Sequence, residues 1–192
     1  DWGKKGTFIQ YGPAWAQVCA GPLRMFKGFL SEGGIRTPLI VSGKDVTGSG
    51  RISDALVHVK DIPATILDAA GVAHPETFEG KKVAPLEGKT LAPVLSNGSD
   101  TVRGPDDWIG WELFGNRAIR QDNWKLLWLC KPFGAGQWQL FDLEDDPGET
   151  KDLASQRPDI RDLLAGHWDE YVQTNNVILP DVSPVCGKTD AG

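Results

Sequence analysis

The residues best suited to chemistry lie between Lys27 and Pro38, in the order Lys-Gly-Phe-Leu-Ser-Glu-Gly-Gly-Ile-Arg-Thr-Pro. The paired glycines Gly33 and Gly34 allow a tight turn or a positive φ angle. Pro38 is tolerated at the start of a strand but not in its middle. The apolar run 39–41 that follows predicts a short buried strand. The order therefore predicts a loop that presents one lysine and then enters the core.

Lys27 is the candidate catalytic and anion-binding residue of this loop. A lysine in a loop is usually a solvated surface charge, but an ammonium on a segment held by glycines is a good point-charge partner for a tetrahedral oxyanion. Such a cation stabilises negative charge that develops during ester cleavage. Arg36 could also bind an anion, although a structural pair with a buried carboxylate is at least as well supported. Glu32 is a candidate for that pair, or for supporting the loop.

Composition limits the class of protein. The chain has 192 residues, of which 40% are hydrophobic, enough for one compact domain with its own core or for one and a half small ones. The net charge of −6 disfavours a nucleic-acid partner, because phosphate backbones are bound by basic surfaces. No apolar run is long enough to span a bilayer, so we expect no membrane span.

Cysteines and tryptophans offer weaker signals. Cys19, Cys130 and Cys186 are too few and too scattered for a disulfide framework or a zinc site, so they leave the compartment open. Five of the eight tryptophans lie within residues 108–138. They could form a carbohydrate-stacking surface, but packing within a sheet is the favoured interpretation because aromatic side chains are common in strands.

The elements that would position the loop at Lys27–Pro38 are predicted from local patterns. Residues 1–36 are predicted as loop. A helix is predicted over 61–71, with Asp61 capping its first amides and Gly71 ending it. Residues 72–105 read as a long polar connection. Four short strands within 108–143 predict an antiparallel meander, and a helix from Pro158 is expected to cover it.

Five motifs, in one order along the chain, closely resemble the sulfatase family, and arylsulfatases in particular. The first is the Lys27–Pro38 segment. The others are Asp61-x-Pro-x-Thr-x-Leu-x-x-x-Gly71, Leu86–Leu95, Ala118–Leu126, and Leu140–Glu149 followed by Asp-Leu-Ala at 152–154. Glu87 stands where the family commonly has aspartate, and Asp122 where it usually has glycine. Each motif is modest alone, but their shared order makes the match specific.

The resemblance implies an α/β fold, namely the C-terminal part of an alkaline-phosphatase-like sulfatase fold that ends in a small antiparallel sheet with a packed helix. Residues 1–105 would belong to the large α/β domain, 106–176 to a small α+β subdomain, and 177–192 to an extended tail. In this family the lysine equivalent to Lys27 holds a sulfate oxygen of a small-molecule sulfate ester. Relatives from bacteria are commonly periplasmic or extracellular.

Two features that the resemblance implies are not found in this sequence. Sulfatases use a formylglycine nucleophile, made from Cys or Ser in a Cys/Ser-x-Pro-x-Arg motif, and a calcium ion with ligands upstream of the lysine motif. Cys130-Lys131-Pro132 echoes the first motif, but Gly134 replaces its arginine and its place in the family's order is wrong. We therefore expect the chain to be a fragment of a sulfatase, and the nucleophile and calcium ligands to lie in a missing N-terminal portion. We expect the fragment to be inactive alone.

Two other functions stay open on the sequence alone. One is a phosphoesterase or phosphonate hydrolase of the same superfamily, because sulfate and phosphate are both tetrahedral anions. The other is a non-catalytic glycan- or protein-binding module built on the tryptophan-rich sheet.

Overall fold

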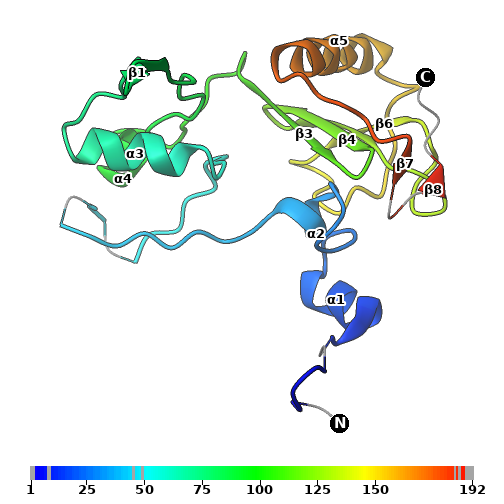
Figure 1. Ribbon diagram of the computed structural model, residues 1–192. Coiled ribbons are helices and arrows are strands. Elements are labelled where there is room, and N and C mark those ends of the chain that lie inside the picture. The colour runs from blue at the N-terminus through cyan, green and yellow to red at the C-terminus, as the bar shows by residue number, and fades with distance from the viewer. Residues whose placement is uncertain are drawn as a thin grey trace. The chain divides into compact units, whose positions relative to one another are not determined.

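The computed structural model describes residues 3–7, 10–44, 46–48, 50–183, 185, 187 and 188 (Figure 1). The chain divides into two compact units. Unit 1 comprises residues 1–37 and 108–192, and unit 2 comprises residues 38–107. Residues 24–36, which we call the lysine loop, therefore pack with the C-terminal sheet, although the two are separated by the whole of unit 2 in the sequence.

Unit 1 is built on a four-stranded antiparallel sheet with the strand order β3-β4-β5-β6. This confirms the predicted meander. The first hairpin turns at Phe114 and Gly115, which both have positive φ angles. Asn116 directly after this turn already pairs with Leu113 in the ladder. The strands are β3 (Trp108–Leu113), β4 (Asn116–Gln121), β5 (Trp124–Trp128) and β6 (Trp138–Asp142).

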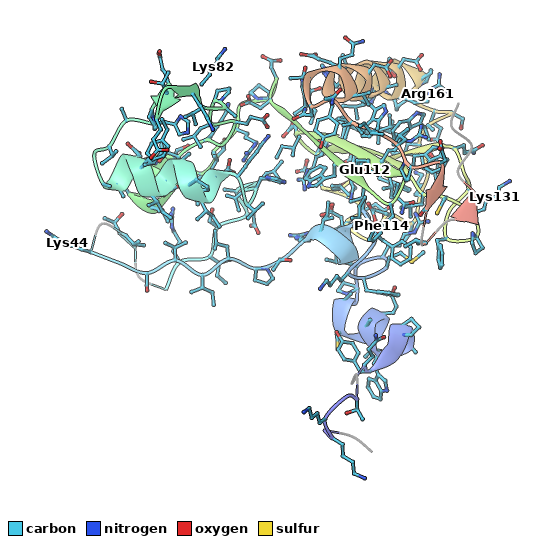
Figure 2. All side chains as sticks on the ribbon, viewed as in Figure 1. Lys44, Lys82, Glu112, Phe114, Lys131 and Arg161 are labelled. Carbon is cyan, nitrogen blue, oxygen red and sulfur yellow. The ribbon has the colours of Figure 1, made fainter. Side chains whose placement is uncertain are left out.

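The two faces of this sheet are covered by different parts of the chain, because alternate side chains of a strand point to opposite faces. Helix α5 (Pro158–Thr174) covers one face, and side chains fill the space between them (Figure 2). Leu164 and Trp168 of α5 pack there against Ile119, Leu126 and Leu140. The predicted C-terminal helix is thus confirmed. On the other face, Phe29 and Leu30 of the lysine loop pack against a separate cluster: Ala118, Leu127, Leu129, Phe141 and Leu143.

The ends of unit 1 contain more regular structure than predicted. Residues 1–36 include helix α1 (Gly12–Ala20) and the single turn α2 (Glu32–Ile35). The loop prediction is wrong over α1, where Pro13 lies in the first turn of a segment that contains three alanines, both favourable in helices. Near the C-terminus, β7 (Val182–Ser183) pairs with β8 (Gly187–Lys188).

Unit 2 contains helix α3 (Asp61–Ala69), the turn α4 (Ala92–Leu95) and a hairpin of β1 (Thr77–Phe78) and β2 (Lys81–Lys82). The predicted helix is confirmed, and Gly71 follows it with a φ of 64°. The predicted capping role of Asp61 is wrong, since Lys60 holds the N-cap position and Asp61 is already the first residue of the helix. Its carboxylate instead accepts hydrogen bonds from the Lys89 amide at 2.9 Å and from the Arg103 guanidinium at 2.7 Å.

The predicted buried strand at 39–41 is also wrong. This segment is extended but belongs to no strand, and the side chain of Ile40 is 92% exposed. A strand needs a neighbour to satisfy its backbone groups, and none of the described strands lies beside this segment.

The compact units group the residues differently from the predicted domains, because residues 1–37 pack with the sheet. The assignment of 1–105 to the large domain of a complete sulfatase stays a proposal. A compact unit of one chain need not coincide with a domain of the longer protein.

Candidate functional site

Lys27 lies in the lysine loop (residues 24–36). Its side chain is exposed, and no hydrogen bond or ion pair joins it to another described residue. The residues that follow are quite different, because Phe29, Leu30, Ser31 and Glu32 are all buried. The loop therefore presents one accessible ammonium immediately before a segment that is fixed in the protein core.

The backbone of the loop closes tightly on the paired glycines. The Gly33 amide donates a hydrogen bond to the Arg24 carbonyl at 2.9 Å. A Cβ atom on Gly33 would lie 2.2 Å from the Met25 carbonyl oxygen, and one on Gly34 would lie 2.1 Å from the Phe29 carbonyl oxygen. The predicted need for glycine is confirmed. Its physical cause is close approach of the backbone rather than a positive φ angle.

Beneath the loop lies a buried ion cluster, which we define as Glu32, Arg120, Lys125 and Glu149. The Lys125 ammonium contacts the Glu32 and Glu149 carboxylates at 2.8 Å each. The second oxygen of Glu149 accepts a hydrogen bond from the Glu32 backbone amide at 3.0 Å. The Arg120 guanidinium lies 3.8 Å from Glu32. Two acids and two bases thus balance their charges, with Glu32, Lys125 and Glu149 buried and Arg120 partly exposed.

Burial dominates the electrostatics of this cluster. Lys125 has no exposed surface, and an unpaired charge there would be costly. Burial lowers the pKa of the Arg120 guanidinium, with the nearby charge of Arg36 acting in the same direction and that of Glu32 acting against it. The hypothesis that Glu32 supports the loop agrees with this geometry.

The alternative pairing of Glu32 with Arg36 is not found. The Arg36 side chain is exposed, and only its backbone amide reaches Glu32, by donating to the carbonyl oxygen at 2.8 Å. The sequence interpretation also missed Lys125 and Glu149 as supports of the loop. Both stand inside quoted family motifs, which was the available signal, but nothing local indicates that a lysine is buried.

The described residues do not fit the calcium ion that the resemblance implies. Within that part of the chain, no group of three or more His, Cys, Asp or Glu side chains could hold a metal ion. The described residues therefore offer no site at which calcium could take part in catalysis.

Cys130 does not fit the formylglycine precursor either. Its side chain is buried and disulfide-bonded, so the sulfur is not available for conversion. A Cβ atom on Gly134, at the motif's arginine position, would already lie 2.4 Å from Leu129. The structure thus supports the interpretation of Cys130-Lys131-Pro132 as a chance match. Cys19 is an exposed free thiol, and Cys186 lies outside the described residues.

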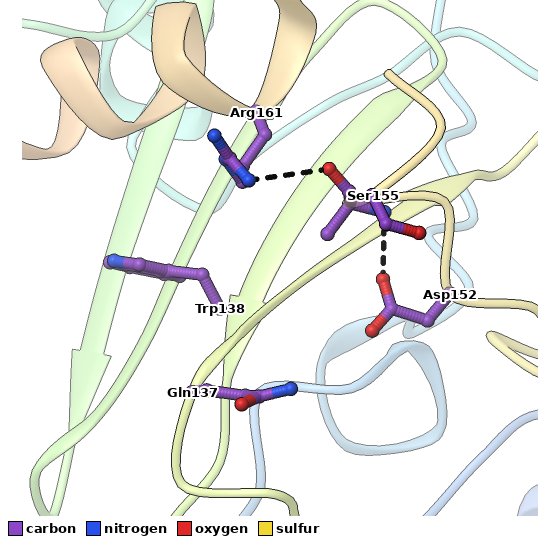
Figure 3. A pocket seen from close by; sticks show the side chains of 6 residues that line it. Gln137, Trp138, Asp152, Ser155 and Arg161 are labelled. Atoms are coloured by element: carbon purple, nitrogen blue, oxygen red, sulfur yellow. Dashed lines mark hydrogen bonds between the residues drawn. The ribbon is translucent and has the colours of Figure 1, made fainter. Parts of the chain in front are cut away.

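A hollow of about 460 Å³ in unit 1 lies between β6 and the start of α5 (Figure 3). Its charged groups are already engaged in the fold. The Asp152 carboxylate accepts the Leu140 and Ala154 amides at 3.1 and 2.9 Å, and Arg161 pairs with Asp162 at 2.8 Å. Its remaining polar lining, Gln137 and Ser155, lies at the surface.

The tryptophans of the sheet are mostly engaged in packing, as favoured from the sequence. Trp108 stacks on His167 with ring centroids 5.4 Å apart, and Trp138 meets Trp168 edge-on at 5.8 Å. The Arg117 guanidinium lies over Trp128, 4.7 Å from the ring centroid.

Several named proteins are similar to this chain in sequence. No protein-family model matches the chain. An uncharacterized sulfatase of Schizosaccharomyces pombe is 41% identical over 181 residues, a match that covers 93% of this chain and 32% of that protein. An arylsulfatase of Klebsiella aerogenes is 33% identical over 93 residues, covering 48% of this chain and 20% of that enzyme. The chain therefore spans a third or less of the length of these curated relatives.

A solved structure shares the fold. The crystal structure of Ps i-CgsB in complex with k-i-k-neocarrahexaose matches with a TM-score of 0.64 and 22% identity, covering 79% of this chain and 32% of that one. The predicted α/β fold with a four-stranded antiparallel sheet and a C-terminal helix is confirmed. The phosphoesterase and binding-module alternatives gain no support from these comparisons. The chain belongs to the sulfatase family, and it is the C-terminal part of a sulfatase.

Proposed function

We propose that the complete protein to which this chain belongs hydrolyses small-molecule sulfate esters, and that Lys27 holds an oxygen of the sulfate group. The observation that carries this proposal is the contrast within the lysine loop. The Lys27 ammonium is exposed and has no partner among the described residues, whereas residues 29–32 are locked in the core. A cation held ready in this way suits an anionic ligand.

The role of Lys27 follows from the chemistry of its ammonium. A compact, positively charged donor stabilises the negative charge that accumulates on sulfate oxygens as the ester bond breaks. Because the loop is fixed before the ligand arrives, little reorganisation is required. We assign the formylglycine, the calcium ion and their ligands to the N-terminal portion of the complete protein, outside this chain.

Replacement of Lys27 in the complete sulfatase tests the proposal. Lys27→Ala should lower kcat/KM for a chromogenic aryl sulfate by about 10²–10³-fold, the usual cost of losing one charge-stabilising donor. Lys151→Ala is the matched control, because Lys151 is an exposed lysine of the same unit and should leave kcat/KM unchanged. Wild-type kinetics in Lys27→Ala would remove this residue from the active site.

We also propose that the chain alone is inactive, because we place the nucleophile and the calcium ligands outside this chain. The purified chain should give no release of the chromogenic phenol above background from an aryl sulfate. Robust turnover that persists in a chelator would contradict this proposal.

The compartment that we propose is periplasmic or extracellular. The resemblance to exported bacterial sulfatases motivates this proposal, and the disulfide at Cys130 supports it, because disulfides persist mainly in oxidising compartments. None of the described helices is long and apolar enough to cross a membrane. Alkylation of the native protein from its host before and after reduction provides a test. Cys130 should react only after reduction, and labelling without reductant would oppose the proposal.

A further inference from the structure

We propose that Lys125 and Glu149 are positioning residues, which set the place of the Lys27 ammonium through Glu32. This inference rests on the proposed role of Lys27. It gives the small C-terminal sheet a function in the reaction, although the sheet contributes no residue that we assign to contact the substrate.

The contacts run from the sheet to the loop in two steps. Lys125 projects from β5 and contacts the Glu32 carboxylate at 2.8 Å. Glu149, in the turn region after β6, accepts the Glu32 backbone amide at 3.0 Å and also contacts Lys125. Both the side chain and the backbone of Glu32 are therefore fixed. Glu32 is only five residues from Lys27.

The segment between Lys27 and Glu32 transmits this restraint because it is itself packed. Phe29 and Leu30 lie in the apolar cluster with Leu127 and Phe141 of the sheet. Across the base of the loop, the Gly33 amide is hydrogen-bonded to the Arg24 carbonyl at 2.9 Å. Lys27 is thus held from both sides, and little freedom remains in the backbone that carries it.

A purely structural role explains the ion cluster less well. Replacing a buried ion pair by packed apolar side chains is often neutral or stabilising, so burial of Lys125 is weak grounds for a role in stability alone. Glu149 contacts two groups at once, with one oxygen beside the Lys125 ammonium and the other accepting an amide hydrogen bond, and this defines geometry that apolar packing would not. Small displacements of a substrate-binding group strongly affect catalysis.

Hydrogen exchange in the complete sulfatase tests the restraint directly. Glu149→Gln keeps the shape of the side chain but removes its charge, and amides of residues 28–35 should then exchange at least about tenfold faster. Amides in β4 and β5 should keep their wild-type rates. The matched control is Glu112→Gln on β3, a carboxylate that accepts the Gly115 amide of its own hairpin at 2.8 Å and is labelled on the sheet in Figure 2. Unchanged exchange of the loop, or equal acceleration throughout the sheet, would overturn the inference.

A double-mutant cycle separates positioning from general loss of stability. Glu149→Gln should lower kcat/KM by about 10- to 100-fold when Lys27 is present, but by less than about twofold in the Lys27→Ala background, because the two residues act through one group. Equal fold-losses in both backgrounds would overturn the positioning role. If Lys27→Ala itself were fully active, the proposed function would fail, whereas the exchange result would still decide whether the cluster restrains the loop.

Discussion

At the scale of single residues, the lysine loop depends on the absence of a side chain at Gly33. A Cβ atom there would lie 2.2 and 2.4 Å from the carbonyl oxygens of Met25 and Arg24, and backbone atoms cannot move aside cheaply. Gly33→Ala should therefore lower the free energy of unfolding of unit 1 by about 1–3 kcal/mol, as overpacking does. Urea unfolding followed by tryptophan fluorescence measures this, because unit 2 contains no tryptophan.

The control for Gly33 is a glycine without near neighbours. Gly166 lies within α5, and a Cβ atom there would meet nothing within 4 Å. Gly166→Ala should leave stability unchanged or raise it by up to about 1 kcal/mol, because alanine favours helix. Equal destabilisation by both substitutions would show that the close approach at Gly33 is not the cause.

His58 should make the stability of unit 2 depend on pH. Burial, with the charges of Lys60 and Arg103, lowers the pKa of this imidazole against the opposing influence of Asp61 and Glu87. The Lys60 amide also donates to its Nδ1 atom at 3.3 Å. In the unfolded chain the imidazole takes up a proton near pH 6.5, whereas in the folded chain protonation requires a lower pH. Stability should therefore fall as the pH drops through about 6.5.

This dependence can be measured from NMR signals of the α3 amides during urea unfolding at pH 7.5 and at pH 5.5. His58→Gln removes the titrating group and should have a smaller difference between the two pH values than wild type. A wild-type protein that is as stable at the lower pH as at the higher would contradict the prediction.

At the scale of elements, α5 offers a matched pair of neighbouring leucines. Leu164 is 1% exposed and packs against the sheet, whereas Leu163 is 52% exposed. Leu164→Ala should lower the free energy of unfolding by about 2–5 kcal/mol through lost burial and the cavity left behind. Leu163→Ala should change it by no more than about 0.5 kcal/mol. Similar losses for both, measured by urea unfolding, would mean that α5 does not cover the sheet as described.

At the scale of the whole molecule, apolar side chains are exposed in both units. Ile40 and Ile52 of unit 2 are 92% and 89% exposed, and Trp15 of unit 1 is 64% exposed. Exposed apolar side chains that gather into a patch usually mark sites that another polypeptide covers, and we propose that the missing N-terminal portion covers these. The isolated chain should therefore self-associate, with a sedimentation coefficient that rises with concentration.

A variant carrying Ile40→Lys and Ile52→Lys should associate less, because two charges interrupt the apolar surface of unit 2. Lys44→Arg, which replaces one exposed cation by another, is the control and should sediment like wild type. A stable monomer over the full concentration range in the unmodified chain would count against the prediction.

Features that depend on neighbours along the chain could be predicted from the residues alone. The meander, α3, α5 and the glycine-dependent loop at Lys27 were all predicted, because alternation, helical spacing and turn residues are local properties. The resemblance that identified the family likewise rests on short motifs, such as Lys27–Pro38. Helix α1 was missed because its glycine, proline and exposed side chains give little amphipathic signal.

Contacts between side chains that are distant in the sequence, and the apolar side chains that stay exposed, could not be predicted in this way. Glu32 lies 93 residues from Lys125 and 117 from Glu149, so no local spacing could reveal the cluster that holds the loop. A lysine is also among the residues least expected in a core. The apolar run 39–41 shows the converse, because its composition predicts burial but burial requires a partner strand. Contacts between distant segments, rather than residue type, settle both outcomes.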